Sequence, residues 1–455
     1  MERLDGKSVA VIGLGVSGVA AARLAFAKGG DVYVSDSSTQ ASTAARAADL
    51  RSSGIAVELG GHDLDRVARA GIVVVSPGIP PDAPVLRALR ERGVRWISEP
   101  ELAVRFYSGQ LIAVTGTNGK TTTTLLITHL LREAGMRAAA GGNVGGGLAP
   151  TASDLALLDE VPDWYVLEMS SFQLAGVETF RPDVGVVTNL SPDHLDYYPD
   201  VEAYFADKAR LFANAEPGSQ WVLPVGDEAV AELAGEAPGE RHFFGGSRES
   251  GSEAWVEDDA LWVEIGAAAE LLLDVADFPL LGAHNVSNAL AAALVASLAG
   301  VSAEDLGRGL ASARPLPHRM EPVAETAGVL WVNDSKATNV AASVSALRSA
   351  DRPVVLLLGG KDKGEAFAPL AAEIPGRVRR VLAYGAAGER IAREVGDATV
   401  VELLGSDFRA VVSRADEVAE DGDMVLLSPA CSSYDMFESY EDRGRAFASL
   451  IEELA

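Results

Sequence analysis

The chain alternates short apolar runs with segments in which apolar residues recur every three or four positions. The first apolar run, residues 7–12, predicts a strand, and a helical pattern follows over residues 18–27. Further strand patterns at residues 31–35 and 72–76 keep the same alternation. Strands that alternate with helices are typical of parallel α/β sheets with helices on both faces. A Rossmann-like parallel sheet is therefore predicted over residues 1–97.

The alternation continues to the end of the chain, with two interruptions. Residues 98–100 and the proline-rich stretch 314–317 break the pattern, and we interpret both as hinges. A chain of 455 residues is also too long for one ordinary core. The predicted fold class is therefore α/β with three domains: the N-terminal Rossmann-like sheet, a central α/β domain over residues 98–313, and a C-terminal Rossmann-like domain over residues 314–455.

Several predicted elements of the second and third blocks can be placed from their patterns. The strands at residues 164–168 and 184–189 end in polar residues, and ligands of open α/β sheets bind at such carboxyl ends. Residues 253–265 predict a hairpin, and the alanine-rich stretch 289–298 predicts a buried helix. In the third block, the apolar run 353–358 predicts a strand that enters a glycine turn.

Composition narrows the class of protein. Hydrophobic residues make up 48% and charged residues 23%, which is normal for a soluble globular protein. The net charge of −27 argues against nucleic acid or an anionic membrane as a partner. No apolar run reaches the length of a membrane span, and no leader pattern is present. The single cysteine, Cys431, fits a reducing compartment. We expect a cytoplasmic monomer.

Residues 111–124 carry the strongest chemical signal. An apolar strand runs into a Gly-x-x-Gly-Lys-Thr turn and then into a helical stretch, which predicts a phosphate cradle at a helix N-terminus. Val114 stands where the usual pattern has its first glycine, and a plain strand-to-helix turn is the alternative. The combination favours ATP and a central domain of the P-loop ATPase type. The predicted ATP-binding residues of this loop are Gly116, Thr117, Asn118, Gly119, Lys120, Thr121 and Thr122.

A second glycine turn, at residues 13–18, has the G-x-G-x-x-G spacing of dinucleotide-binding proteins. Asp36 follows about twenty residues later, after the second predicted strand. Alone, this pattern would favour an NAD-dependent enzyme. Another nucleotide diphosphate can occupy such a turn, and close packing of helix on strand requires the same glycines, so the ligand stays open at this point.

Polar residues at strand tips and a small set of lysines supply candidate chemistry. Glu168 ends a predicted strand of the ATP-loop domain and is a natural Mg²⁺ ligand, while His194 follows the next strand tip. Lys208 lies in an amphipathic segment, where a solvated lysine is the default. The chain has seven lysines among 38 basic residues, so each is a candidate for a task that guanidinium cannot perform. Four lie in these motifs: Lys120, Lys208, Lys336 and Lys363.

Taken together, the motifs resemble the Mur ligases of peptidoglycan synthesis, and the match extends in order through all three blocks. The residues that carry it are 115–122, 168–174, 189–196, 282–289, 318–321, 334–339 and 428–437. Residues 76–79, 141–145 and 334–339 are most similar to the D-glutamate-adding branch. The resemblance implies that ATP phosphorylates the free carboxylate of UDP-N-acetylmuramoyl-L-alanine and that the amine of D-glutamate attacks the resulting acyl phosphate.

The resemblance also implies roles for individual residues. It gives Lys120, Glu168, His194 and Lys208 catalytic roles, with two Mg²⁺ ions held by Thr121, Glu168, His194 and Lys208. Because an ammonium cannot bind a cation, Lys208 is expected to be carbamylated. The nucleoside of ATP is expected at Asn285, Arg319 and Asp334. UDP-sugar binding is expected at Gly13, Leu14, Gly15, Val16, Ser17, Asp36, Ser37, Gly78 and Asn143. D-glutamate is expected at Lys336, Thr338, Lys363, Ser433 and Tyr440.

Two departures from the family pattern bear on the amino-acid pocket, and other functions stay as alternatives. The family often has Phe where this chain has Tyr440, and the choice of Lys363 over Lys361 is open.

A dehydrogenase would leave the ATP loop unused. Folylpolyglutamate synthetases normally begin at that loop, whereas a whole block precedes it here. A non-catalytic nucleotide-binding switch would bind ATP but release no phosphate when offered both the muramoyl-alanine nucleotide and D-glutamate. The absence of an Asp-Asn-Pro-Arg run weighs against the diaminopimelate- or lysine-adding ligase.

Overall fold

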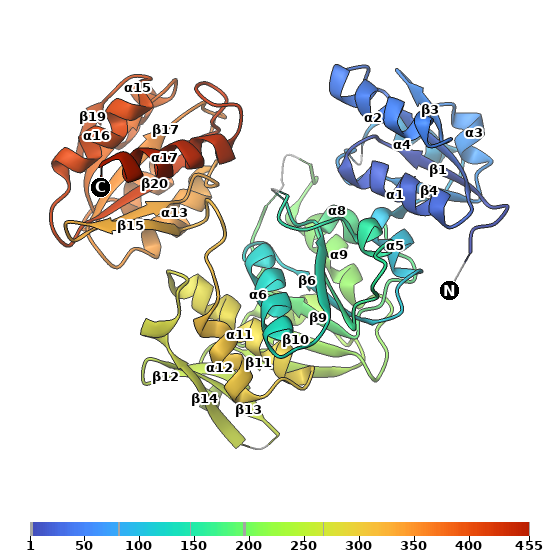
Figure 1. Ribbon diagram of the computed structural model, residues 1–455, viewed down its shortest axis with the longest axis horizontal. Helices are drawn as coiled ribbons and strands as arrows, with labels where there is room; N and C mark the ends of the chain where they lie inside the picture. Colours follow the sequence, from blue (N-terminus) through green and yellow to red (C-terminus); the bar gives the residue numbers. More distant parts are fainter. Residues whose placement is uncertain (1–2, 81, 146, 194–196, 267, 455) are drawn as a thin grey trace. The chain divides into compact units, whose positions relative to one another are not determined.

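The computed structural model describes residues 3–80, 82–145, 147–193, 197–266 and 268–454. Within these residues the strands form three separate sheets of five, nine and six strands (Figure 1). All three sheets are wholly or mostly parallel, and helices alternate with the strands along the chain. The predicted fold class, α/β with a parallel sheet in each of three blocks, is confirmed.

The N-terminal sheet is parallel throughout, with the strand order β3-β2-β1-β4-β5. Successive residues of β1 face opposite sides: Val9 and Val11 join one core with α1 and α2, while Ala10 and Ile12 join another with α3 and α4. This continuous burial on both faces is what an apolar run without alternation predicts. The elements are β1 Ser8–Ile12, α1 Val16–Ala27, β2 Asp31–Asp36, α2 Ala41–Ser52, β3 Ala56–Leu59, α3 Leu64–Ala68, β4 Ile72–Val75, α4 Pro84–Glu91 and β5 Ile97–Ser98.

The central sheet has the order β14-β13-β12-β11-β10-β9-β6-β8-β7. Its strands are parallel except for the pairs β12–β13 and β13–β14. The strands are β6 Gln110–Thr115, β7 Ala138–Gly142, β8 Trp164–Glu168, β9 Val184–Val187, β10 Gln220–Pro224, β11 Glu240–Phe244, β12 Ala254–Glu257, β13 Ala260–Ile265 and β14 Ala268–Asp274. The helices are α5 Glu99–Val104, α6 Lys120–Glu133, α7 Ala152–Leu155, α8 Ser171–Leu174, α9 Val201–Ala209, α10 Glu228–Ala234, α11 Ala283–Leu298 and α12 Ala303–Ala311.

The predicted hairpin is formed by β12 and β13. Its turn residues Asp258 and Asp259 have φ of 49° and 56°, and a two-residue hairpin loop of this hand matches the twist of the strands it joins. The hairpin prediction is confirmed. The predicted strand 184–189 is shorter in the structure, because the residues after Val187 leave the sheet to bond the loop that follows β6.

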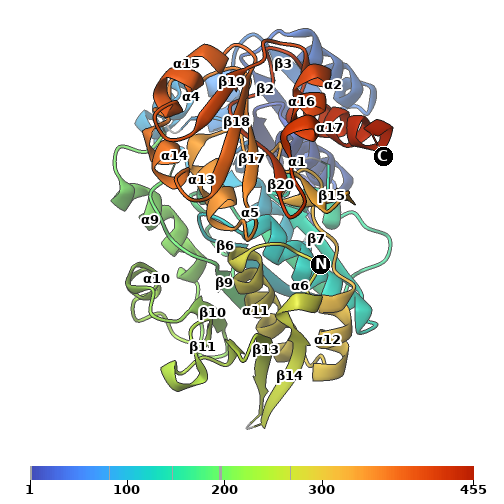
Figure 2. The same ribbon diagram turned by 90° about the vertical axis from the view of Figure 1, so that its left-hand side faces the viewer.

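The C-terminal sheet has the order β15-β16-β20-β17-β18-β19, in which only the β15–β16 pair is antiparallel. Helices α13, α14 and α15 pack on one face, and α16 and α17 on the other (Figure 2). The strands are β15 Glu321–Thr326, β16 Val329–Asn333, β17 Val354–Gly359, β18 Val378–Tyr384, β19 Val400–Leu403 and β20 Met424–Ala430. The helices are α13 Val340–Arg348, α14 Ala368–Glu373, α15 Gly388–Val395, α16 Phe408–Val418 and α17 Tyr440–Leu454.

By compactness the chain divides into two units. The first contains residues 1–275 and 287–310, and the second contains residues 276–286 and 311–455. The predicted boundary at residues 97/98 lies between the two residues of β5, inside the first unit. The domain limits 1–97, 98–313 and 314–455 stay predictions.

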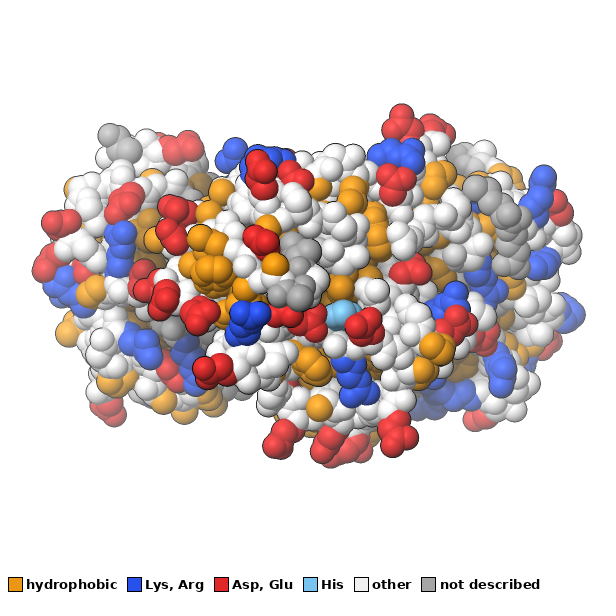
Figure 3. Space-filling view, turned by 90° about the horizontal axis from the view of Figure 1, so that it is seen from below, with side chains coloured by type: hydrophobic (Ala, Val, Ile, Leu, Met, Phe, Trp, Pro, Cys, Tyr) orange, Lys and Arg blue, Asp and Glu red, His pale blue; other side chains and the backbone are white. Residues whose placement is uncertain are grey.

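No helix in the described part of the chain is both long and apolar enough to cross a bilayer. Acidic and basic side chains are interspersed on the face drawn in Figure 3.

Candidate active site

The loop between β6 and α6 is shaped by two glycines. Gly116 has φ of 137° and Gly119, which caps α6, has φ of 80°. A Cβ on Gly116 would lie 2.0 Å from Thr188 Oγ1, and one on Gly119 would lie 2.3 Å from Asn288 Oδ1. Both positions therefore need glycine for conformation and for space. Helix α6 begins at Lys120, so the loop has the strand–turn–helix context that a phosphate cradle requires.

Residues that follow β9 hold this loop in place. The amide of Thr117 donates to Asn189 O at 3.0 Å, and the amide of Asn118 donates to Asn189 Oδ1 at 3.0 Å. The hydroxyl of Thr188 donates to Asn118 O at 2.6 Å. Thr188 and Asn189, just after β9, thus support the β6–α6 loop, so the start of the sequence motif at residues 189–196 has a structural task besides any chemistry.

Glu168 meets the start of α6 at the carboxyl end of β8. Thr121 Oγ1 donates to Glu168 Oε2 at 2.7 Å, and Asn143 Nδ2 donates to Glu168 Oε1 at 2.9 Å. Glu168 and Thr121 are both buried. A carboxylate and a hydroxyl in contact are oxygen ligands of the kind that Mg²⁺ prefers. The two residues assigned to one cation are therefore adjacent, and the Asn143 amide contacts the same carboxylate.

Lys208 is buried, in contrast to the default of a solvated lysine. Its side chain is 1% exposed, Nζ donates to Gly116 O at 2.7 Å, and the ammonium lies 4.7 Å from the centre of the Tyr204 ring. The pKa of Lys208 is lowered to about 7, mainly by burial and also by the positive charge of Lys120. The nearby carboxylates of Asp193 and Glu168 act in the opposite direction.

Lys120 lies over its own loop. Its Nζ donates to Gly116 O at 3.1 Å and to Thr117 O at 2.8 Å. Two lysines thus converge on one carbonyl oxygen, which concentrates positive charge where phosphates are predicted to bind.

His194, the remaining predicted metal ligand, lies outside the described residues. Among the residues that are described, no group of three or more His, Cys, Asp or Glu side chains is arranged to hold a metal ion.

The glycine turn after β1 is organised by the end of β2. Gly13 N donates to Ser35 O at 2.8 Å, and Leu14 N donates to Asp36 Oδ2 at 2.6 Å. A Cβ on Gly18 would lie 1.9 Å from Gly13 O, so this third glycine serves close packing. Helix α1 begins at Val16, with Gly15 as its cap and Ser17 in its first turn, and Ser37 and Gly78 lie in the turns after β2 and β4. These predicted UDP-sugar residues share one carboxyl edge.

The predicted amino-acid residues lie together at the carboxyl edge of the C-terminal sheet. Lys336 Nζ lies 4.2 Å from the centre of the Tyr440 ring, and Lys363 Nζ donates to Thr338 Oγ1 at 3.3 Å. Ser433 is buried in the turn after β20. Lys361 instead forms a main-chain bridge with Ser432. The adjacency of β16, β20 and β17 brings these loops together.

The three residues predicted at the ATP nucleoside belong to the second compact unit. Arg319 lies between His318 and Met320, which have φ of 63° and 42°, and such backbone strain is concentrated at functional sites. Asp334 Oδ1 accepts from Met320 N at 3.2 Å. Burial raises the pKa of Asp334 to about 7, although hydrogen bonds lower the pKa in part. Asn285 Nδ2 donates to Leu281 O at 2.8 Å.

Comparison with known proteins identifies the family. Three family models match successive parts of the chain: the N-terminal domain of MurD-like Mur ligases at residues 7–98, the Mur ligase middle domain at residues 114–296 and the Mur ligase, glutamate ligase domain at residues 318–431. The UDP-N-acetylmuramoylalanine–D-glutamate ligase of Acidobacterium capsulatum is 42% identical over 98% of this chain and 96% of its own. The enzyme of the same name from Anaeromyxobacter dehalogenans is 44% identical over 99% of each chain. This chain belongs to the Mur ligase family.

Solved structures of Mur ligases share the fold. The UDP-N-acetylmuramate–alanine ligase of Thermotoga maritima superposes with a TM-score of 0.59 at 19% identity, covering 99% of this chain and 100% of its own. The MurF ligase of Thermotoga maritima, solved in complex with ADP, gives a TM-score of 0.58 at 18% identity over 100% and 97%. At these identities the likeness concerns the fold alone.

Arg443, a buried residue of this Mur ligase, is not among the site residues that the sequence predicted. Arg443 of α17 is completely buried and donates to Ser335 Oγ at 2.9 Å, to Ser335 O at 2.9 Å, and to Cys431 O at 3.1 Å. The guanidinium thus ties the turn after β16 to the turn after β20. A sequence signal existed, since Arg443 shares a helical stripe with the buried Phe447 and Ile451.

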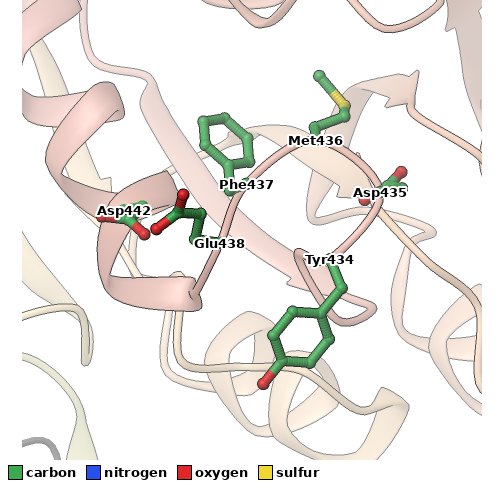
Figure 4. Close-up of a pocket in the computed structure, with 6 residues that line it drawn as sticks. All are labelled: Tyr434, Asp435, Met436, Phe437, Glu438 and Asp442. Atoms are coloured by element: carbon green, nitrogen blue, oxygen red, sulfur yellow. The ribbon is translucent and has the colours of Figure 1, made fainter. Parts of the chain in front are cut away.

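A pocket of about 480 Å³ lies in the turn between β20 and α17 (Figure 4). Five of its six lining residues lie between Ser433 and Tyr440 in the chain, and one of these, Tyr434, is 70% exposed. The lining residues are Tyr434, Asp435, Met436, Phe437, Glu438 and Asp442. Asp435 Oδ2 accepts from Ala386 N at 2.9 Å, which ties this turn to the one after β18.

Proposed function

We propose that this protein is an ATP-dependent ligase that joins D-glutamate to UDP-N-acetylmuramoyl-L-alanine in peptidoglycan synthesis. The observation that carries the proposal is the identity of 38–44% to enzymes of this name over nearly the whole chain. The β6–α6 loop adds the phosphate cradle that such a reaction needs. We further propose that the protein works in the cytoplasm as a monomer.

Lys120 and the loop amides are proposed to bind the phosphates of ATP. Lys120 at present donates to Gly116 O and Thr117 O. These are carbonyl acceptors that an anionic phosphate would replace, because a charged acceptor makes the stronger hydrogen bond. Phosphoryl transfer depends mainly on positioning and on neutralising the equatorial oxygens. Lys120 would supply that neutralisation while the loop fixes the triphosphate.

Thr121 and Glu168 are proposed to hold a Mg²⁺ ion. The fit rests on two oxygen atoms already 2.7 Å apart at the loop, one of them an anionic carboxylate. When bound, the ion would neutralise charge on the phosphates that this loop holds. Asn143 is proposed to orient Glu168 in addition to meeting the muramoyl-alanine part, because its amide fixes Oε1.

A second Mg²⁺ ion is proposed at His194 and Lys208, with Lys208 carbamylated. An ammonium cannot ligate a cation, whereas a carbamate offers two anionic oxygens. The burial of Lys208 supports the modification, because desolvation disfavours the ammonium and leaves the amine neutral often enough to react with CO₂. The proximity of Lys120 favours the same outcome, since two ammoniums beside one carbonyl repel each other.

Three groups of side chains are proposed to bind the substrates. The turn of residues 13–17, with Asp36, Ser37 and Gly78, would take the uridine diphosphate, because a helix N-terminus favours phosphate. Asn285, Arg319 and Asp334 would contact the nucleoside of ATP. The carboxylates of D-glutamate suit Lys336 and Lys363, together with Thr338, Ser433 and Tyr440. Lys363 is preferred over Lys361 because its ammonium reaches Thr338.

The test is phosphate release from ATP with UDP-N-acetylmuramoyl-L-alanine and a panel of D- and L-amino acids. Release should require both the nucleotide and D-glutamate, and Lys120→Met should abolish it. Lys28→Met, which changes a partly exposed lysine of the N-terminal block, serves as the matched control. ATP binding without phosphate release would indicate a nucleotide switch. Tight NADH binding without ATP hydrolysis would indicate a dehydrogenase.

A further inference from the structure

A histidine outside the proposed site residues lies beside the N-terminal glycine turn. His62 follows β3 after two glycines, and the amides of Gly60 and Gly61 donate to Asp36 O at 2.8 and 3.3 Å. His62 Nδ1 lies 2.8 Å from the hydroxyl oxygen of Ser35. The loop after β3 is therefore attached to the end of β2, at the carboxyl edge where ligands of open α/β sheets bind.

Ser35 and Asp36, which hold the loop that carries His62, also hold the glycine turn. Ser35 is completely buried, and its carbonyl accepts from Gly13 N at 2.8 Å. The carboxylate of Asp36 accepts from Leu14 N at 2.6 Å. The imidazole and the proposed diphosphate site are thus anchored to one rigid segment, so a ligand on the turn would meet a ring of fixed orientation.

The outer ring nitrogen of His62 is available to a ligand. Burial lowers the pKa of His62, so the ring is neutral near pH 7 although Asp36 and Glu58 act in the opposite direction. A neutral imidazole has one donor and one acceptor nitrogen. Nδ1 is engaged by Ser35, and within the described residues no hydrogen bond is made by Nε2. The amides of Gly60 and Gly61, which donate to Asp36 O, already attach the loop after β3 to β2, so His62 is not needed for that attachment.

We propose that His62 is a specificity-determining residue that binds the imide edge of uracil through Nε2. The inference rests on the proposed function, which supplies a uridine nucleotide as substrate. The tautomer with its proton on Nδ1, which donates to Ser35 Oγ, leaves Nε2 as an acceptor for the N3–H of uracil. Cytosine has no hydrogen on N3, so a ring held in this tautomer would distinguish the two bases.

The experiment compares the affinities of the full-length protein for UDP and CDP by isothermal titration calorimetry. For His62→Ala we expect a loss of about 5- to 10-fold for UDP, the effect of one hydrogen bond, with little change for CDP. The matched control is Asp65→Ala, three residues further on, whose side chain is exposed and, among the residues that the structure describes, pairs only with Arg92. This variant should bind both nucleotides as the wild type does.

An unchanged affinity of His62→Ala for UDP would overturn the inference, and so would equal losses for UDP and CDP, which indicate a structural role. If His62→Ala does not fold, the histidine signals of the wild-type protein decide the question by NMR. UDP should shift the Nε2 resonance of His62, CDP should shift it less, and equal shifts overturn the proposal. A wild-type protein that binds UDP but releases no phosphate with D-glutamate would contradict the proposed function while leaving this inference intact.

Discussion

Lys208 occupies an environment that is costly for an ammonium ion. Its side chain has no carboxylate in direct contact among the described residues and shares the Gly116 carbonyl with Lys120. Such a group is retained only where the charge is compensated or removed. Carbamylation removes the ammonium and creates an anion next to Lys120, so the residue would change from a repulsive to an attractive neighbour of the loop.

We therefore predict that Lys208→Ala lowers the rate of phosphate release by about 10²–10³-fold, as expected for loss of a group that stabilises charge in the site. Added acetate or formate should restore part of the rate, because a free carboxylate can occupy the space of the carbamate. Labelled ¹³C-bicarbonate should give a carbamate carbon signal in the wild type that is absent from the variant. A full rate for Lys208→Ala, or no such signal in the wild type, contradicts the carbamate.

Glycines of the ATP loop allow a second test at the residue scale. Gly119 and Gly135 both have φ of 80°, at opposite ends of α6. A Cβ at Gly119 meets Asn288, whereas one at Gly135 meets nothing within 4 Å. Both alanine variants carry the strain of the left-handed region, about 1–2 kcal/mol. Only Gly119→Ala should also lose at least tenfold in ATP affinity. Calorimetry measures this affinity for both variants. Equal affinities in the two variants would contradict the loop geometry.

At the scale of elements, the sequence predicted strands and loops better than the surroundings of single side chains. The strand Trp164–Glu168 and the turn at Asp258–Asp259 follow from local pattern and turn chemistry. The contacts of Lys208 and Arg443 do not, because a charged residue on the apolar stripe of a helix gives the same pattern whatever groups surround it, even where the stripe indicates burial, as it does for Arg443. Their neighbours come from distant loops, which periodicity does not identify.

Helix α5 contains two buried carboxylates in different surroundings. Glu101 accepts hydrogen bonds from the amides of Glu178, Thr179 and Phe180. Glu99 accepts from Ser153 N through one oxygen, and its other oxygen has no partner among the described residues. Burial raises the pKa of Glu99 to about 7. The folded state therefore binds this proton more tightly than the unfolded chain does.

The sign of the pH dependence follows from linkage. For Glu99 the folded pKa exceeds the unfolded value of 4.5, so the stability it contributes is full below pH 4.5 and is lost as pH rises to about 7. The loss amounts to roughly 3 kcal/mol. Glu99→Gln should remove this dependence and unfold at higher denaturant concentration than the wild type at pH 8, but not at pH 5.

Glu101→Gln is the matched control from the same helix. It loses charge-assisted hydrogen bonds and should be less stable than the wild type at both pH values. Chemical denaturation followed by tryptophan fluorescence measures all three proteins. A wild-type stability that is constant between pH 5 and pH 8, or a Glu99→Gln variant that is destabilised at pH 8, would show that Glu99 does not titrate in this range.

At the scale of the whole molecule, the net charge of −27 opposes the approach of anionic substrates. Acidic and basic side chains are interspersed on the face in Figure 3, so on that face the charge does not gather in one patch. Salt screens the field of the net charge over about 30 Å at 0.01 M and about 8 Å at 0.15 M. The lysines at the loop lie close to the predicted position of the phosphates, and their attraction acts at short range.

We predict that the association rate of ATP rises about 2- to 5-fold between 10 and 150 mM NaCl, because long-range repulsion is screened before the contacts with Lys120 are. Stopped-flow measurements with a fluorescent ATP analogue test this at constant Mg²⁺. An equal osmolality of sucrose is the control and should not accelerate binding. Above about 0.3 M salt the rate should level off, since the screening length then falls below the size of the site. A rate that falls steadily from the lowest salt would mean that attraction by the local lysines already governs the encounter, and that the overall charge has no part in it.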